Sequence, residues 1–145
     1  MPLKPHREAL AILLVEDDEG DAWAVERAFL KTGFAKSIVR ANDGLEALDI
    51  LKGTNGKTRL ARPCLLLVDM NMPRMNGIEF VRALREDKEL CRLIVFMLST
   101  SKHQADETAA YDLNVAGYIT KAKLSEDFTK LVDLVGIYSS IVEIV

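Results

Sequence analysis

Short apolar runs alternate with amphipathic segments along most of this chain. Three runs are apolar at every position, which predicts strands buried on both faces of a sheet: residues 11–15, 64–68 and 93–98. A weaker strand is expected at 37–41, and a short fifth strand at 117–120. Apolar side chains recur at helical spacing in four segments between the strands: residues 21–32, 44–51, 77–86 and 106–113. Regular alternation of strands and helices predicts an α/β protein with a doubly wound, five-stranded parallel sheet.

Polar residues and glycines mark the expected helix ends. Gly33 is expected to end the first helix, and Asn42 or Asp43 to cap the second. Ser125 is expected to cap a last helix, with the two acidic residues after it in the first turn. Leu45, Leu48 and Leu51 are expected to form the buried stripe of the second helix. The basic segment 52–62 is interpreted as a solvated loop in preference to a docking site.

Composition narrows the class of protein. With 145 residues, 49% of them hydrophobic, residues 1–145 are expected to form one domain, with its core over about 11–138. The net charge of −3 argues against a dedicated nucleic-acid binder. No apolar run reaches the roughly 18 residues of a spanning helix, and no signal peptide precedes the first strand, so a cytoplasmic protein with no membrane partner is expected. Cys64 and Cys91 lack metal-site spacing and are interpreted as reduced thiols.

Charged residues gather where the expected strands end. Glu16 and Asp17 follow the first strand, Asp69 follows the third and Lys121 follows the fifth. Ligands of open parallel sheets bind at this edge, and three converging carboxylates require a cation, for which oxygen ligands favour Mg²⁺. A carboxylate beside a metal and a lysine can accept a phosphoryl group. In the alternative interpretation, Asp69 caps a turn and Lys121 is solvated. The acidic residues after the first strand then form a helix N-terminus, the interpretation that Asp18 and Asp21 fit better.

Four segments together resemble the response-regulator receiver domain of two-component signalling. They are LLVEDD (13–18), LLLVDMNMPRMNG (65–77), FMLSTS (96–101) and AGYITK (116–121). Each segment alone is a weak motif, but their order and spacing over residues 11–138 are specific. The resemblance implies five parallel strands in the order 2-1-3-4-5, the flavodoxin-like fold.

The resemblance also implies a role for each residue of the site. Asp69 would be the phosphoacceptor. Asp17 and Asp69 would bind Mg²⁺ directly, Glu16 would act mainly through water, and the backbone carbonyl of Asn71 would supply a further ligand.

Three further positions match the family's residues that respond to the phosphoryl group. Lys121 would contact its oxygens, and Ser99 would donate a hydrogen bond, with Thr100 and Ser101 as neighbouring alternatives. Tyr118 would be the aromatic residue that reorients, although a core tyrosine is the other interpretation of this position. Ala122 departs from the family, in which a proline usually follows the lysine.

The C-terminal segment indicates how a phosphorylated receiver of this kind would pass on its signal. Most positions from 131 to 145 are large and apolar, more than one helix face can bury, which indicates an interface. A long basic loop and an apolar tail resemble the stand-alone regulators of bacterial phytochromes. This resemblance implies a sensor histidine kinase as partner, of the phytochrome type, and a homodimer. The expected dimer residues are Tyr138, Ile141, Val142 and Ile144.

Three other functions are alternatives for the same sheet. A phosphotransfer intermediate would pass its phosphoryl group to a histidine phosphotransfer protein without a stable dimer. A hydrolase acting on phosphate esters would need an acid two residues after Asp69, where the chain has Asn71. A flavin-binding module would need a phosphate loop rich in Ser, Thr or Gly after the first strand. The sequence therefore favours a signalling protein over an enzyme.

Overall fold

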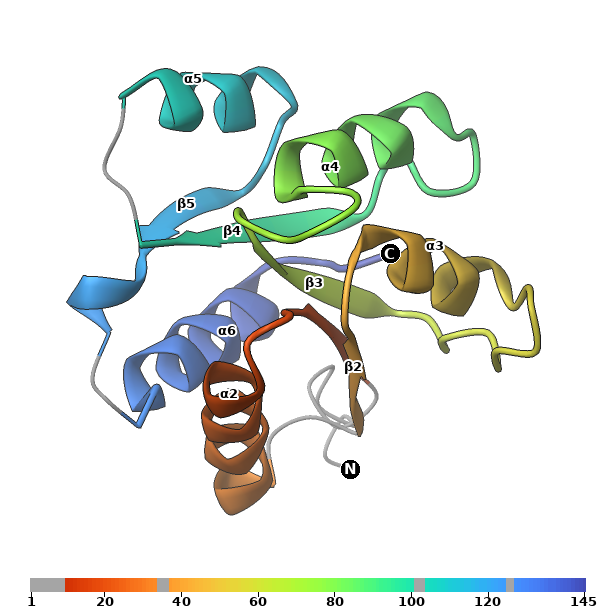
Figure 1. Ribbon diagram of the computed structural model, residues 1–145. Coiled ribbons are helices and arrows are strands. Elements are labelled where there is room, and N and C mark those ends of the chain that lie inside the picture. Colours follow the sequence, from red (N-terminus) through yellow and green to blue (C-terminus); the bar gives the residue numbers. More distant parts are fainter. Residues whose placement is uncertain (1–9, 34–36, 101–103, 125–126) are drawn as a thin grey trace.

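A five-stranded parallel sheet forms the centre of the molecule (Figure 1). The computed structural model describes residues 10–33, 37–100, 104–124 and 127–145. The strands are β1 (Ala11–Val15), β2 (Ser37–Ala41), β3 (Cys64–Asp69), β4 (Ile94–Ser99) and β5 (Gly117–Thr120). They lie in the order β2-β1-β3-β4-β5, so the predicted fold and strand order are confirmed.

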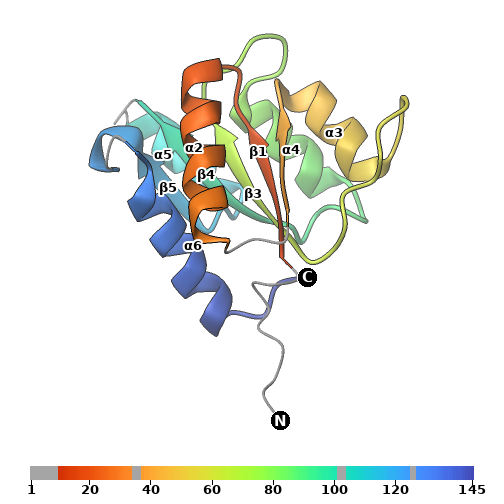
Figure 2. The same cartoon turned by 90° about the horizontal axis from the view of Figure 1, so that it is seen from below.

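Helices cover both faces of the sheet (Figures 1 and 2). The helices are α2 (Glu19–Thr32), α3 (Gly44–Lys52), α4 (Gly77–Glu86), α5 (Gln104–Asp112), the 3₁₀ helix η1 (Lys121–Lys123) and α6 (Thr129–Ile141). Helices α2 and α6 lie together on one face, and α3, α4 and α5 lie on the other. None of these described helices is both long enough and apolar enough to cross a membrane.

Alternation along each strand divides the apolar side chains between two cores. Leu13 and Leu66 pack with the helices α3 and α4, whereas Ile12 and Leu65 pack with α2 and α6. Successive side chains of a strand point to opposite faces, so a strand covered on both sides must be apolar throughout. This requirement explains why β1, β3 and β4 are the most apolar segments of the sequence.

Short polar side chains set the start of the first helices. Asp18 accepts from the backbone N–H of Asp21 at the start of α2, and Asp43 accepts from that of Glu46 at the start of α3. Gly33 ends α2 with a left-handed φ of 61°. The cap of α3 is therefore Asp43, one of the two residues expected.

The buried side of α3 differs from the expected leucine stripe. Ala47, Ile50 and Leu51 are buried, whereas Leu45 is 43% exposed. Positions 45 and 47 lie about 200° apart around a helix, so burial of Ala47 turns Leu45 outward. The prediction was wrong for Leu45 alone, because the small Ala47 lies against the sheet in its place. Leu51 is buried and Leu48 is half-buried against the core, as expected.

The last helix begins later than expected. Phe128 is buried in the core beneath α2 and α6, with a left-handed φ of 59°, and α6 starts at Thr129. Asp127 precedes the helix, and its carboxylate accepts from the hydroxyl of Thr129 at 3.1 Å. The proposed cap Ser125 lies outside the described residues. Placing Asp127 in the first helical turn was wrong, because the backbone turns at Phe128 to bury its ring.

The C-terminal segment returns to the sheet. The backbone N–H of Cys64 donates to the carbonyl of Val145, and Ile144 packs against the core beneath α2 and α6. The Tyr138 ring meets Phe96 edge-on, with 5.1 Å between centroids. Both cysteines are free thiols, and burial raises the pKa of Cys64 to about 11, which makes it unreactive at neutral pH.

Candidate functional site

Three carboxylates converge where β1 and β3 end. Glu16 and Asp17 follow β1 directly, and Asp69 is the last residue of β3. These strands are neighbours in register, with Val15 opposite Val68, so the residues that follow lie side by side. One oxygen from each carboxylate lies within 4.8 Å of the others. Glu16 and Asp69 are buried while Asp17 is exposed, so one side of the cluster is open to solvent.

Lys121 joins this cluster from the far edge of the sheet. Its ammonium group lies 2.8 Å from Glu16 Oε1 and 3.1 Å from Asp69 Oδ1. A third carboxylate oxygen, Asp21 Oδ2, lies 2.8 Å from the same nitrogen. Sequence reasoning assigned Asp21 only to the acidic first turn of α2. The contact between Asp21 and Lys121 joins residues 100 positions apart, and no local pattern reveals it.

Burial and mutual repulsion perturb the acids of the site. Burial raises the pKa of Glu16 to about 7, with Asp69 adding to the rise and Lys121 opposing it. Burial also raises the pKa of Asp69, where Lys121 opposes the rise and Asp17 adds to it. For Lys121, burial would lower the pKa, but hydrogen bonds to Asp21 and Glu16 outweigh it and raise the pKa. One buried ammonium thus faces an excess of carboxylates, and such a site favours a cation.

Arg40 on β2 fixes the backbone of Glu16 and Asp17 through two hydrogen bonds. Its Nε donates to the carbonyl of Glu16 at 3.0 Å, and its Nη2 donates to that of Asp17 at 3.2 Å. The backbone N–H of Glu16 donates to the carbonyl of Ala41. These bonds fix the backbone from which two of the carboxylates project. Arg40 was not identified from sequence, because an arginine on a weak strand resembles any solvent-facing residue.

The loop after Asp69 is fixed at several points. The backbone N–H of Met70 donates to Leu98, and that of Gly77 donates to Met70. A β-carbon added to Gly77 would lie 2.6 Å from the carbonyl oxygen of Asp69, so α4 begins in direct contact with the strand end. Arg74 pairs with the buried Asp43 at the start of α3. Asn71, the expected carbonyl ligand, lies within this loop.

Ser99 and Tyr118 lie on the strands that lead away from Asp69. Ser99 is the last residue of β4, is fully buried and pairs with Thr120. Thr100 is exposed, and Ser101 lies outside the described residues. Tyr118 on β5 is half-buried and packs against the core beneath α3, α4 and α5. Its backbone N–H donates to the hydroxyl of Tyr111. Ala122 is exposed within η1, next to Lys121.

The expected dimer residues divide into two groups. Tyr138 and Ile144 pack against the core of their own chain, and Val142 is half-buried. Ile141 is 75% exposed, and two further apolar residues of α6, Leu134 and Ile137, are exposed with it. The apolar surface of α6 therefore consists of Leu134, Ile137 and Ile141.

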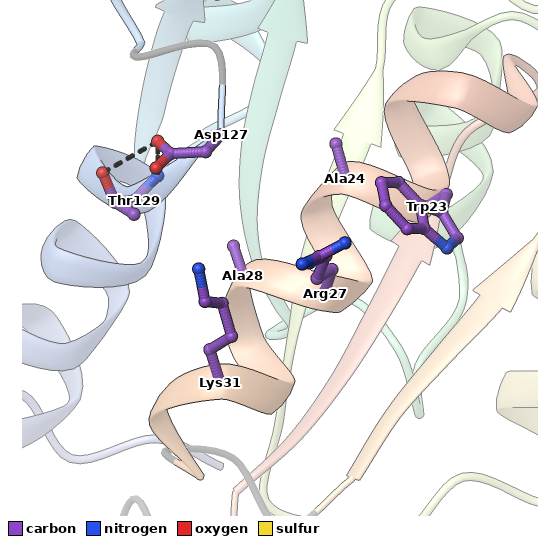
Figure 3. Close-up of a pocket in the computed structure, with 7 residues that line it drawn as sticks. All are labelled: Trp23, Ala24, Arg27, Ala28, Lys31, Asp127 and Thr129. Atoms are coloured by element: carbon purple, nitrogen blue, oxygen red, sulfur yellow. Dashed lines mark hydrogen bonds between the residues drawn. The ribbon is translucent and has the colours of Figure 1, made fainter.

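A separate cavity of about 320 Å³ lies between α2 and the start of α6 (Figure 3). Its lining residues are Trp23, Ala24, Arg27, Ala28, Lys31, Asp127 and Thr129. The Arg27 guanidinium stacks over the exposed Trp23 ring, 5.0 Å from its centroid. None of the three clustered carboxylates lines this cavity.

Comparison with known proteins agrees with this geometry. The family model of the response regulator receiver domain matches residues 12–133. The chain is 33% identical to the response regulator Rcp1 of Synechocystis sp. over 121 residues, which are 83% of this chain and 82% of that protein. The manganese-bound structure of Rcp1 has a TM-score of 0.80 at 31% identity, covering 93% of this chain and 98% of that one. The phosphorylated cyanobacterial phytochrome response regulator RcpA has a TM-score of 0.76 at 33% identity, covering 90% and 91%.

Proposed function

The chain belongs to the response regulator receiver family, and on that premise we propose that it is a signalling switch phosphorylated on Asp69. The observation that carries the proposal is the placement of this carboxylate. It lies at the end of a buried strand, beside Glu16 and Asp17 and 3.1 Å from the Lys121 ammonium. In this proposal the whole chain, residues 1–145, acts as one receiver domain in the cytoplasm.

The side chains present fit Mg²⁺. Their donors are hard carboxylate oxygens within 4.8 Å of one another, and burial leaves the negative charge of Glu16 and Asp69 poorly solvated. Glu16, Asp17, Asp69 and the carbonyl of Asn71 would hold the ion. The bound ion supplies compensation for the charge that accumulates on the transferring phosphoryl group. The manganese-bound structure of the related Rcp1 supports a divalent cation in a protein of this kind.

The reaction proposed is transfer from a phosphohistidine of a sensor kinase. A carboxylate oxygen of Asp69 attacks phosphorus, the phosphorus–nitrogen bond breaks, and the histidine ring keeps the bonding electrons and takes up a proton. Lys121 is positioned to contact the oxygens of the transferred group as a compact charge. Ser99 would donate a hydrogen bond to them. The Tyr118 ring would change its orientation on β5, the edge strand of the sheet.

We propose a histidine kinase of the phytochrome type as the phosphoryl donor. The support is similarity to RcpA and to regulators described as serving bacteriophytochromes and red-light signalling. The test is a panel of histidine kinases incubated with ATP and this chain, with Asp69→Asn as the control. Faster labelling by phytochrome kinases than by the others supports the partner, whereas equal or slower labelling refutes it.

The proposed output is a homodimer that uses the apolar surface of α6. Leu134, Ile137 and Ile141 expose apolar side chains on one helix, and a symmetric pairing of two copies would bury them. A phosphotransfer intermediate is the alternative, and it would stay monomeric. Sedimentation of the chain with and without a phosphoryl analogue separates the two, because only the switch forms a dimer.

A further inference from the structure

We propose that Asp21 competes with the phosphoryl group for Lys121, and so sets how readily Asp69 is modified. This inference rests on the proposed function and assigns to α2 a positioning residue outside the cluster of three carboxylates. Asp21 lies in the first turn of α2, and its Oδ2 is 2.8 Å from the Lys121 ammonium. It would hold Lys121 in the unphosphorylated protein and release it when the acceptor is modified.

The number of donors on a lysine makes the competition unavoidable. An ammonium group has three N–H donors, and Lys121 has three carboxylate partners here, at 2.8, 2.8 and 3.1 Å. Its side chain is only 11% exposed, so there is little room for a further partner. A phosphoryl oxygen that needs this ammonium must therefore displace one of the carboxylates.

Asp21 is the partner that is least costly to displace. The side chain of Glu16 is 1% exposed, so its carboxylate would be left without solvent, whereas that of Asp21 is 35% exposed and water can solvate it again. Asp69 itself carries the phosphoryl group. A cation bound by the clustered carboxylates would also interact with Glu16 and Asp69. Asp21 lies outside that cluster, so it would be the carboxylate that still holds Lys121.

A purely structural explanation of Asp21 makes a different prediction. An acid in the first turn of a helix interacts favourably with the helix dipole, and its loss would lower stability without changing the affinity for anions. Asp18 provides the matched control. It is an exposed carboxylate one turn away, at the N-cap of the same helix, and it has no ion pair with Lys121. Asn caps helices as well as Asp does, so Asp18→Asn removes the same charge without removing the cap.

The experiment measures beryllofluoride affinity in the presence of saturating Mg²⁺, for wild type, Asp21→Asn, Asp21→Glu and Asp18→Asn. Asp21→Asn should bind beryllofluoride about threefold to fivefold more tightly, the range expected for loss of a partly exposed ion pair. Asp18→Asn should match wild type, and Asp21→Glu should restore the competition and the weaker binding. Mg²⁺ affinity measured alone should not rise in Asp21→Asn, because a negative charge near the ion has been removed.

The outcomes separate the inference from the function on which it rests. Failure of wild type to bind beryllofluoride with Mg²⁺ would refute the proposed phosphorylation switch. If wild type binds and Asp21→Asn binds equally or more weakly, the competition is refuted and Asp21 is structural. An equal gain in Asp18→Asn would also refute it, because a general charge effect would then explain the result.

Discussion

Replacing Gly77 by alanine should destabilise the fold and move the strand end that carries Asp69. A β-carbon at this position would lie 2.6 Å from the Asp69 carbonyl oxygen, 2.7 Å from Met97 Cε and 3.0 Å from Met70 Cα. The Met97 methyl group can rotate away. The two backbone atoms cannot, so either α4 or the segment after β3 must shift.

The magnitude follows from two opposing effects. Alanine is favoured over glycine in a helix by up to about 1 kcal/mol. Forcing an extra carbon into a filled site costs about 1–3 kcal/mol, and contact with rigid backbone places Gly77 in the upper part of that range. The free energy of unfolding should therefore fall by about 1–2 kcal/mol.

Gly20 is the matched control, because it lies in the first turn of α2 as Gly77 does in α4. The atoms nearest to its added β-carbon are the Asp18 carboxylate oxygens, at 3.9 and 4.0 Å. Gly20→Ala should therefore be neutral or stabilising. Urea denaturation measures both variants, and Mg²⁺ titration should show weaker binding only in Gly77→Ala. The reasoning is refuted if Gly77→Ala is as stable as Gly20→Ala and binds Mg²⁺ as wild type does.

Three further predictions concern the metal, the switch and the dimer. Asp17→Ala should weaken Mg²⁺ binding at least about tenfold, roughly 1.4 kcal/mol, in a calorimetric titration, and an unchanged affinity would locate the metal elsewhere. Lys121→Ala and Ser99→Ala should keep Mg²⁺ binding but lose the change in the Tyr118 ring signals that beryllofluoride causes in NMR spectra, and a wild-type response would exclude this route of coupling. Ile141→Asp should convert a dimer into a monomer in analytical ultracentrifugation, whereas a monomeric wild type with and without beryllofluoride would end the dimer proposal.

Local chemistry explains why so much of the fold could be predicted. Strands buried on two faces must be apolar throughout, so residues 11–15 and 64–68 were identifiable without any tertiary information. The acids after β1 and β3 and the lysine after β5 were expected to meet, because parallel strands end at the same edge of the sheet. The structure brings Glu16, Asp17, Asp69 and Lys121 together as that argument requires.

The contacts that could not be predicted from the sequence depend on packing between elements that are distant along the chain. Arg40 reaches the carbonyls of Glu16 and Asp17 only because β2 lies beside β1, and Asp21 reaches Lys121 only because α2 begins near the end of β5. In the basic loop 52–62, the ion pair between Lys57 and Glu46 of α3 was likewise not predicted. Such contacts leave no periodic signal in the sequence, so only the folded arrangement reveals them.

The proposed function requires that Asp69 accept a phosphoryl group in a reaction that depends on the neighbouring carboxylates. Intact-mass spectrometry after incubation with acetyl phosphate and Mg²⁺ tests it most directly, with wild type, Asp69→Asn and a metal-free sample of wild type. We expect one added phosphoryl group on wild type with Mg²⁺, and none on Asp69→Asn or without the metal. Equal addition to Asp69→Asn would show that the acceptor is a different residue, and no addition to wild type with Mg²⁺ would contradict the proposed function itself.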